Sequence, residues 1–209
     1  RASIQHASLT QWQILIATVG LPARGKTHLA HAIQRYLRWL GVQCSVFNQA
    51  NMRREKLGAL NALPPDYFGS GEKATETQAK RRLVEEALML KIREFFESGG
   101  QVAVYDANNT SQALRARICD RFTGDGIQVM FIGTSAMQLP LTEECLCDNK
   151  EMIQANIQSM QRFSPDYVGW SSQDMLEHFE KRIEWHSRTY EPISESTFPH
   201  LSLIHISRA

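Results

Sequence analysis

The chain of 209 residues lacks the features that mark several specialised classes of protein. Its longest apolar runs, such as Ile14 to Val19, are far shorter than the roughly 20 residues that a membrane-spanning helix needs. Its four cysteines have neither the density nor the spacing of a disulfide framework or a zinc ribbon, so we expect reduced thiols and a cytoplasmic protein. The net charge of only +1 supplies no general attraction for nucleic acid or an acidic membrane. We therefore expect neither of these as a partner.

What the chain does contain is the composition of an ordinary globular protein, with 43% hydrophobic and 22% charged residues. At roughly 150 residues per domain, the length predicts one sizeable domain. Residues 1–12 form a polar leader without an apolar targeting core. We expect a single domain over residues 13–209.

Apolar runs and helical periodicities alternate along the chain. Apolar runs typical of buried strands occur at 14–19, 101–106 and 129–132, and residues 42–48 predict a further short strand. Apolar positions three or four residues apart predict helices over about 29–40, 75–98, 114–122, 150–160 and 173–190. This alternation predicts an α/β fold with a doubly wound, mainly parallel sheet and helices on both faces. Ligands of such folds bind beyond the carboxyl ends of the strands.

Three segments fit this alternation less well. Residues 57–71 are rich in Gly, Pro and Asn, which predicts a loop or a broken helix that could act as a lid. Residues 135–144 predict a surface insertion, and residues 201–206 could add a last strand.

The strongest motif lies between the first predicted strand and the first predicted helix. It consists of Gly20, Leu21, Pro22, Ala23, Arg24, Gly25, Lys26 and Thr27, which fit the pattern G-x-x-x-x-G-K-[ST] of a nucleotide-binding P-loop. In such a loop successive backbone amides and the helix dipole point at one anion, as the phosphates of a nucleotide require. We expect Lys26 to reach the β- and γ-phosphates and Thr27 to bind Mg²⁺, while Arg24 adds charge or faces water. The alternative, a glycine-rich turn without a ligand, leaves the lysine and the hydroxyl at the helix start unexplained.

A second candidate, Asp106, ends the predicted strand over residues 101–106. An acidic residue at the end of such a strand suits the metal or the attacking group of a P-loop enzyme. Capping of the following helix is the alternative role, because Asp is a good N-cap residue. Together with the upstream P-loop, Asp106 becomes a candidate for Mg²⁺ binding, for general base catalysis, or for both.

Several further motifs carry a family resemblance. They are Gly20 to Thr27, Arg35 to Val42, Val46 to Asn48, Arg53 to Glu55, Gly99 to Ala107 and Ser164 to Tyr167. In order and in most spacings they resemble the kinase domain of the 6-phosphofructo-2-kinase/fructose-2,6-bisphosphatase family, from about Ile14 to Ile206. The resemblance implies a P-loop NTPase-like fold and transfer of the γ-phosphoryl group of ATP to the 2-hydroxyl of fructose 6-phosphate. The product, fructose 2,6-bisphosphate, regulates glycolysis.

The resemblance also implies roles for individual residues. ATP would be held by Gly20 to His28 and by Asn156, Ile157, Gln158, Ser159, Met160 and Gln161. Asp106 would be the catalytic acid-base or metal residue, and Arg53, Arg182 and Tyr190 match positions around the sugar phosphate. Cys147 matches an active-site cysteine of the family, although the role of a buried, apolar-like thiol fits its chemistry better.

Several positions depart from the family pattern. The family sequence Asp-Ala-Thr-Asn has Asn108 in place of the threonine, and a family lysine falls at Gln161, next to Arg162. A neutral amide does not replace an ammonium group electrostatically, so this second change weakens the expected catalysis. Two family arginines align to Lys80, beside Arg81, and to Leu114, beside Arg115. A family tyrosine appears as His186, which we expect to gain charge below about pH 6.5.

The chain lacks the Arg-His-Gly motif of the family's phosphatase half, so we expect no phosphatase activity from these residues. A fused bisphosphatase domain outside this chain and a homodimer are both compatible with the resemblance.

Two other functions stay open at this stage. The acceptor could be another small molecule, such as a nucleotide or a different sugar. The protein could also be an ATP-binding regulatory module with weakened catalysis.

Overall fold

The computed structural model describes residues 12–64, 67–68, 75–133, 150–191 and 193. Its sheet has four strands, β1 (Ile14–Val19), β2 (Cys44–Asn48), β3 (Val102–Asp106) and β4 (Gln128–Gly133). They pair in the order β2-β3-β1-β4, and every pair is parallel. All four strands lie where the sequence predicts them, which confirms the parallel sheet.

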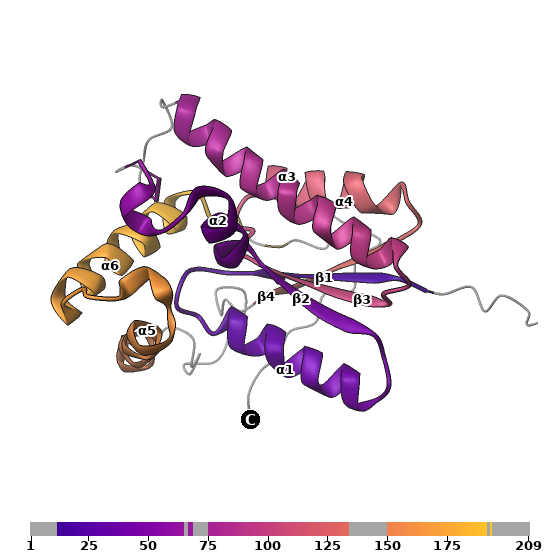
Figure 1. The fold of residues 1–209 in the computed structure, drawn as a ribbon, viewed down its shortest axis with the longest axis horizontal. Helices are drawn as coiled ribbons and strands as arrows, with labels where there is room; N and C mark the ends of the chain where they lie inside the picture. Colours follow the sequence, from indigo (N-terminus) through magenta and orange to yellow (C-terminus); the bar gives the residue numbers. More distant parts are fainter. Residues whose placement is uncertain (1–11, 65–66, 69–74, 134–149, 192, 194–209) are drawn as a thin grey trace, which may run out of the picture.

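Six helices accompany the sheet in the described residues. They are α1 (Lys26–Trp39), α2 (Gln49–Leu57), α3 (Thr75–Glu97), α4 (Gln112–Thr123), α5 (Lys150–Phe163) and α6 (Ser172–Arg188). Figure 1 shows α1 on one face of the sheet and α3 and α4 on the other, as a doubly wound fold requires. It shows α5 and α6 beyond the end of the sheet at which β1 leads into α1.

The two faces of the sheet bury separate apolar cores. On the α1 side, Ala30 packs with Val102 and Val104 of β3. On the opposite side, Ile92 and Phe122 belong to a larger core with alternate residues of the same strands. The burial of both faces explains why the central strands β1 and β3 appear in the sequence as apolar runs.

A third core lies outside the sheet, between α5 and α6. Ile157 of α5 packs there against Met175 and Phe179 of α6 and against Tyr167. Tyr167 belongs to a short 3₁₀ helix, Pro165–Tyr167, that connects the two helices. This layer brings a second set of side chains to the carboxyl end of the sheet.

The segment after β2 contains structure that the sequence pattern does not predict. Helix α2 begins directly after Asn48, whose side-chain oxygen accepts a hydrogen bond of 2.9 Å from the Asn51 N–H. The predicted loop after α2 contains a short 3₁₀ helix, Leu60–Ala62. The predicted insertion at 135–144 and the predicted strand at 201–206 lie outside the described residues. Within the described residues, every helix is too short or too polar to cross a membrane.

The buried face of α3 offers a direct test of the core. Ile92 is fully buried, whereas Leu90 on the same helix is 50% exposed. We expect Ile92→Ala to lower the free energy of unfolding by about 2–5 kcal/mol, because it leaves a cavity among packed side chains. Leu90→Ala should change it by less than about 1 kcal/mol. Urea unfolding of both variants measures the difference, and equal effects would contradict the described orientation of α3.

Candidate active site

The P-loop connects β1 to α1 through a bend with unusual backbone angles. Gly25 has φ +77° and stands at the N-cap of α1, and Ala23 has φ +60°. The Gly20 N–H donates a hydrogen bond of 2.9 Å to the Asn108 carbonyl, which joins the start of the bend to the segment after β3. The bend thus lies at the carboxyl ends of the two central strands, where the sequence predicts the ligand site.

Lys26 is the charged group at the centre of this bend. Its side chain is buried, and its ammonium donates a hydrogen bond to the Leu21 carbonyl. Burial lowers the pKa of Lys26 to about 7, the Asp106 carboxylate opposes this shift, and Arg182 and Arg24 add to it. A buried ammonium of this kind is stabilised by an incoming anion. The bend is therefore suited to bind phosphate.

Asp106 ends β3 and is 3% exposed. Its Oδ2 accepts a hydrogen bond of 2.5 Å from Asn48 Nδ2, and the two residues are register partners at the ends of β2 and β3. Ser111 caps α4 by accepting a hydrogen bond from the Leu114 N–H. Helix capping, the alternative role for Asp106, is thereby excluded.

The donor groups present fit Mg²⁺ better than a metal held by the protein alone. Among the described residues, no group of three or more His, Cys, Asp or Glu side chains is placed to hold a metal. Mg²⁺ takes one or two carboxylates and completes its coordination with water and substrate phosphates. Asp106, with the exposed Thr27 at the start of α1, provides a donor set of that type.

Three arginines from different elements converge next to this end of the sheet. They are Arg53 on α2, Arg81 on α3 and Arg182 on α6. Burial raises the pKa of Tyr67, and all three guanidinium groups oppose that shift, which places them around one ring. Arg53 is buried and forms an ion pair with Asp166, which also binds Arg54 at 2.8 Å.

Aromatic rings and neutral oxygens, one of a hydroxyl and one of a backbone carbonyl, hold the other two guanidinium groups. Arg182 lies 4.2 Å from the ring centroid of Phe68 and donates a hydrogen bond of 3.1 Å to the Tyr167 hydroxyl. Arg81 lies 4.5 Å from the ring centroid of Trp185 and donates at 2.9 Å to the Tyr67 carbonyl. Such contacts orient a guanidinium while its positive charge remains. The cluster is suited to an anionic group.

His186 and Asn108, two departures from the family pattern, are in contact. Asn108 Nδ2 lies 2.8 Å from His186 Nε2. Burial lowers the pKa of His186 to about 3, and Arg182, Lys26 and Arg81 add to the shift. The expectation that His186 gains charge below about pH 6.5 is therefore wrong, because the imidazole is shielded from water and surrounded by cations.

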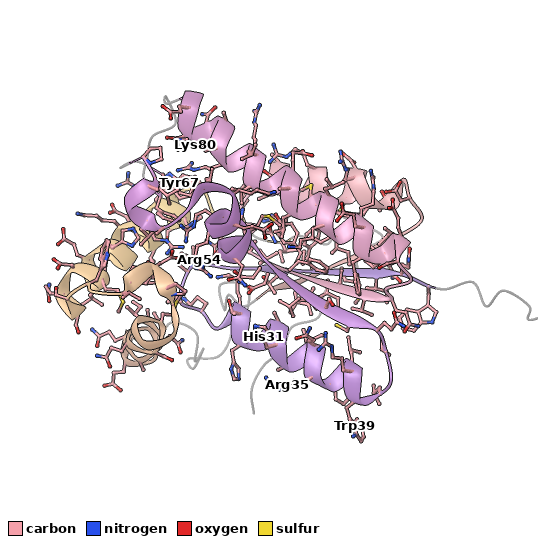
Figure 2. All side chains as sticks on the ribbon, in the orientation of Figure 1. His31, Arg35, Trp39, Arg54, Tyr67 and Lys80 are labelled. Atoms are coloured by element: carbon pink, nitrogen blue, oxygen red, sulfur yellow. The ribbon has the colours of Figure 1, made fainter. Side chains whose placement is uncertain are left out.

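Two family arginines align to Lys80 and Leu114, and each of these positions is followed by an arginine, Arg81 or Arg115. The structure shows which of the neighbours lies at the site. Lys80, near the start of α3 (Figure 2), forms an ion pair of 2.7 Å with Glu76, whereas the Arg81 guanidinium lies over the Trp185 ring in the arginine cluster. Leu114 packs against the main core. Arg115 is 1% exposed and donates to the backbone carbonyls of Asn109, Thr110 and Glu191. Arg115 therefore binds the protein's own backbone instead of facing the site.

The remaining candidates are dispersed. Tyr190 packs against the main core, and His28 is exposed on α1. Ile157 is buried in the core between α5 and α6, while Gln158, Ser159 and Met160 are exposed. Asn156 contacts the P-loop, since its Nδ2 donates at 2.9 Å to the Ala23 carbonyl. Gln161 and Arg162 belong to the last turn of α5, and Cys147 lies outside the described residues.

Four residues of the site carry no predicted role from the sequence. Asn48 contacts Asp106, and Phe68 contacts Arg182. Asp166 pairs with Arg53, and Trp185 contacts Arg81. A polar residue at the end of the second predicted strand was the available signal for Asn48. The contacts of the other three depend on tertiary structure alone.

Comparison with known proteins identifies the family. A family model described as 6-phosphofructo-2-kinase matches residues 2–208. The chain belongs to the 6-phosphofructo-2-kinase family. It is 34% identical to rat 6-phosphofructo-2-kinase/fructose-2,6-bisphosphatase 1 over 92% of this chain and 38% of that protein. It is likewise 34% identical to the human form 4 over 95% of this chain and 39% of that protein.

The chain therefore spans about 40% of the length of these relatives. Two solved structures share the fold of this chain. A putative kinase from Chloroflexus aurantiacus matches with a TM-score of 0.55 and 17% identity, over 93% of this chain and 89% of that one. Kti12 from Chaetomium thermophilum, solved in complex with ADP-AlF3, matches with a TM-score of 0.50 and 14% identity, over 91% and 88%. At identities of 17% and 14%, these matches show a similar fold and nothing about function.

The contacts of Arg115 predict a stabilising role that can be separated from substrate binding. Arg115→Met should lower the free energy of unfolding by about 3 kcal/mol, because three backbone carbonyls lose their donor. The partly exposed Arg121, 3.7 Å from Glu86 on the neighbouring helix, provides the control. Arg121→Met should cost less than about 1 kcal/mol. Urea unfolding measures both, and a stable Arg115→Met variant with weakened substrate binding would contradict this role.

The lowered pKa of His186 predicts a dependence of stability on pH. The unfolded chain takes up a proton near pH 6.5, whereas the folded ring does so only near pH 3. Stability therefore falls as the pH decreases below 6.5, and this group contributes a loss of about 2 kcal/mol between pH 8 and pH 5. His186→Gln should remove that part of the loss in urea unfolding at the two pH values.

The exposed His31 on α1 gives the matched control for this measurement (Figure 2). His31→Gln should keep the dependence on pH of the unsubstituted protein. If His186→Gln keeps it as well, the imidazole is not buried in its neutral form.

Proposed function

We propose that the protein transfers the γ-phosphoryl group of ATP to the 2-hydroxyl of fructose 6-phosphate and forms fructose 2,6-bisphosphate. The single observation that carries the proposal is the position of the buried Lys26 ammonium. The Asp106 carboxylate raises the pKa of this ammonium, and the Arg182 guanidinium lowers it, so both charges act on it. One site thus combines a phosphate-binding loop, a carboxylate and a guanidinium cluster, in a chain of the 6-phosphofructo-2-kinase family.

The P-loop would hold the triphosphate. Its backbone amides and the start of α1 face one anion, and Lys26 adds a full positive charge to the β- and γ-phosphates. Mg²⁺, bound through Thr27 and Asp106, would neutralise charge on the phosphate oxygens. Phosphoryl transfer depends mainly on such positioning and charge stabilisation.

Asp106 would also orient the attacking group. The Asn48 amide fixes one oxygen of its carboxylate and so sets the plane of the group. A carboxylate at this place can accept the proton of the sugar 2-hydroxyl as that oxygen attacks the γ-phosphorus. The ADP leaving oxygen departs on the opposite side of the phosphorus.

The guanidinium cluster of Arg53, Arg81 and Arg182 would bind the 6-phosphate of the sugar. Guanidinium groups bind phosphate through paired, charge-assisted hydrogen bonds. The charges of Arg182, Lys26 and Arg81 act on His186, so the Asn108–His186 pair would face the sugar hydroxyls. Its neutral imidazole adds hydrogen-bonding capacity without charge.

A second candidate function is motivated by Gln161, which stands where the family has a lysine. Loss of that charge favours either a kinase of another small acceptor or an ATP-binding regulatory module. Incubation of the protein and Mg·ATP with fructose 6-phosphate, with other sugars and with nucleoside monophosphates in separate reactions, followed by mass spectrometry and NMR of the products, separates the three functions. Phosphate on the 2-position supports the proposal, phosphate on other sugars or nucleotides supports the second, and binding without turnover supports the third.

The role of Lys26 predicts the behaviour of a charge-removing variant. We expect Lys26→Met to abolish most phosphoryl transfer, by at least about a hundredfold, because the charge on the transferring group loses its partner. Folding should persist, since the variant removes a buried ammonium. Lys181→Met on the exposed side of α6 is the control and should keep full activity. Product formation and thermal unfolding check both, and an active Lys26→Met variant would refute the assigned phosphate site.

A further inference from the structure

Arg182 of the guanidinium cluster is held by two neighbours that both contact one histidine. The Arg182 guanidinium lies 4.2 Å from the centroid of the Phe68 ring and donates a hydrogen bond of 3.1 Å to the Tyr167 hydroxyl. The centroid of the His178 ring lies 5.5 Å from that of Phe68, and His178 Nδ1 lies 3.0 Å from the Tyr167 hydroxyl oxygen. His178 and Arg182 are four positions apart on α6, so they lie on the same face of the helix. His178 thus touches two of the groups that orient the guanidinium.

The available protons decide the direction of each hydrogen bond at the Tyr167 hydroxyl. A guanidinium has donors only, so the hydroxyl oxygen accepts the hydrogen bond from Arg182. The hydroxyl has one hydrogen of its own, and His178 Nδ1 is placed to accept it. Tyr167 is 2% exposed, and a buried hydroxyl whose hydrogen lacks an acceptor is costly. The arrangement therefore requires that Nδ1 carries no proton and that the hydrogen of the neutral ring lies on Nε2.

The surroundings of His178 keep its ring neutral and fixed in place. Burial lowers the pKa of His178 to about 4, and the Arg182 guanidinium adds to this shift. The rings of Tyr167 and Trp170 pack edge-to-face against the imidazole at centroid distances of 5.7 and 5.4 Å. A neutral imidazole held in this way presents the lone pair of Nδ1 in one direction.

The guanidinium that these contacts orient keeps its capacity to bind an anion. Arg182 Nε is buried and makes no hydrogen bond to any residue that the structure describes. The Tyr167 hydroxyl and the Phe68 ring are neutral, so the positive charge of Arg182 is not compensated by them. This charge lowers the pKa of Lys26 as well, so Arg182 acts within the site described above.

We propose that His178 is a positioning residue that orients Arg182 for the phosphate group of the sugar substrate. It acts through Tyr167, because Nδ1 accepts the hydroxyl hydrogen and the hydroxyl oxygen thereby turns its lone pairs to the guanidinium. The proposal rests on the sugar-phosphate role proposed above for the guanidinium cluster. In this role His178 does not touch the substrate, and its effect passes through Tyr167 and Arg182.

A double-mutant cycle between positions 178 and 167 tests this role. In the unsubstituted background, His178→Phe keeps an aromatic ring but removes the acceptor. It should raise the KM for fructose 6-phosphate about tenfold, because the hydroxyl no longer holds Arg182 in place. In the Tyr167→Phe background the same change should raise the KM less than about twofold, because the hydroxyl is already absent. Steady-state kinetics at saturating Mg·ATP measures all four proteins, and equal losses in both backgrounds would overturn the proposal.

Three further measurements separate positioning from a merely structural role. His178→Asn places an amide oxygen close to the position of Nδ1, so its KM should stay within about threefold of that of the unsubstituted protein. A KM as high as that of His178→Phe would contradict the proposal. The Kd for Mg·ATP, from isothermal titration calorimetry without sugar, should be unchanged in every variant, and a general loss of ATP affinity would also contradict it. His31→Phe, the same change at an exposed histidine of α1, is the matched control and should leave the KM unchanged.

NMR of the imidazole nitrogens separates failure of this proposal from failure of the proposed function. In protein with isotope-labelled histidine and without substrate, His178 should show a proton on Nε2 and none on Nδ1 at neutral pH. Loss of the signals in His178→Phe assigns them, and Tyr167→Phe should shift the Nδ1 resonance towards that of a nitrogen without a hydrogen bond. If the protein neither binds nor phosphorylates fructose 6-phosphate, the proposed function fails while these signals still support the hydrogen-bond chain. A proton on Nδ1, or an Nδ1 resonance that Tyr167→Phe leaves unchanged, would overturn the proposal even in an active kinase.

Discussion

The burial of a positive charge at the end of β1 is the constraint on which the rest of the site depends. The Lys26 ammonium loses water on folding, and this loss lowers its pKa to about 7. Arg24 and Arg182 make the environment still less favourable, and the Asp106 carboxylate opposes them. Burial of this charge lowers the free energy of unfolding, and an anion bound next to it raises that free energy again. The elements around Lys26 position the charged groups that act on this ammonium.

The groups around Lys26 come from two separate parts of the fold. The parallel sheet supplies the P-loop after β1 and Asp106 after β3, at positions set by strand register. The α5–α6 layer lies beyond the sheet and supplies Arg182 and His186 from α6. Because both parts meet at Lys26, a change in the packing of α5 against α6 alters the charges around the phosphate-binding loop. Arg53 of α2 and Arg81 of α3 complete the cluster around the ring of Tyr67.

The sequence predicts the sheet well because its two central strands, β1 and β3, are buried on both faces and appear as apolar runs. It does not predict α2, a helix in which polar residues predominate and whose start depends on the Asn48 cap. The P-loop and Asp106 are recognisable from their spacing alone. The partners of the arginines are not, since Asp166 lies more than a hundred positions from Arg53 and Arg54. The charge state of His186 also depends on burial, which local sequence does not reveal.

Two departures from the family pattern that look alike in the sequence have opposite structural meanings. In each case an arginine stands one position after the family's place, and one position along a helix rotates a side chain by about 100°. Arg81 turns towards Trp185 and the ring of Tyr67, so the guanidinium stays in the cluster. Arg115 turns inwards to three backbone carbonyls and leaves the cluster. Within the cluster, neutral groups orient Arg81 and Arg182 and leave their charge available to a phosphate, whereas Arg53 is paired with the Asp166 carboxylate.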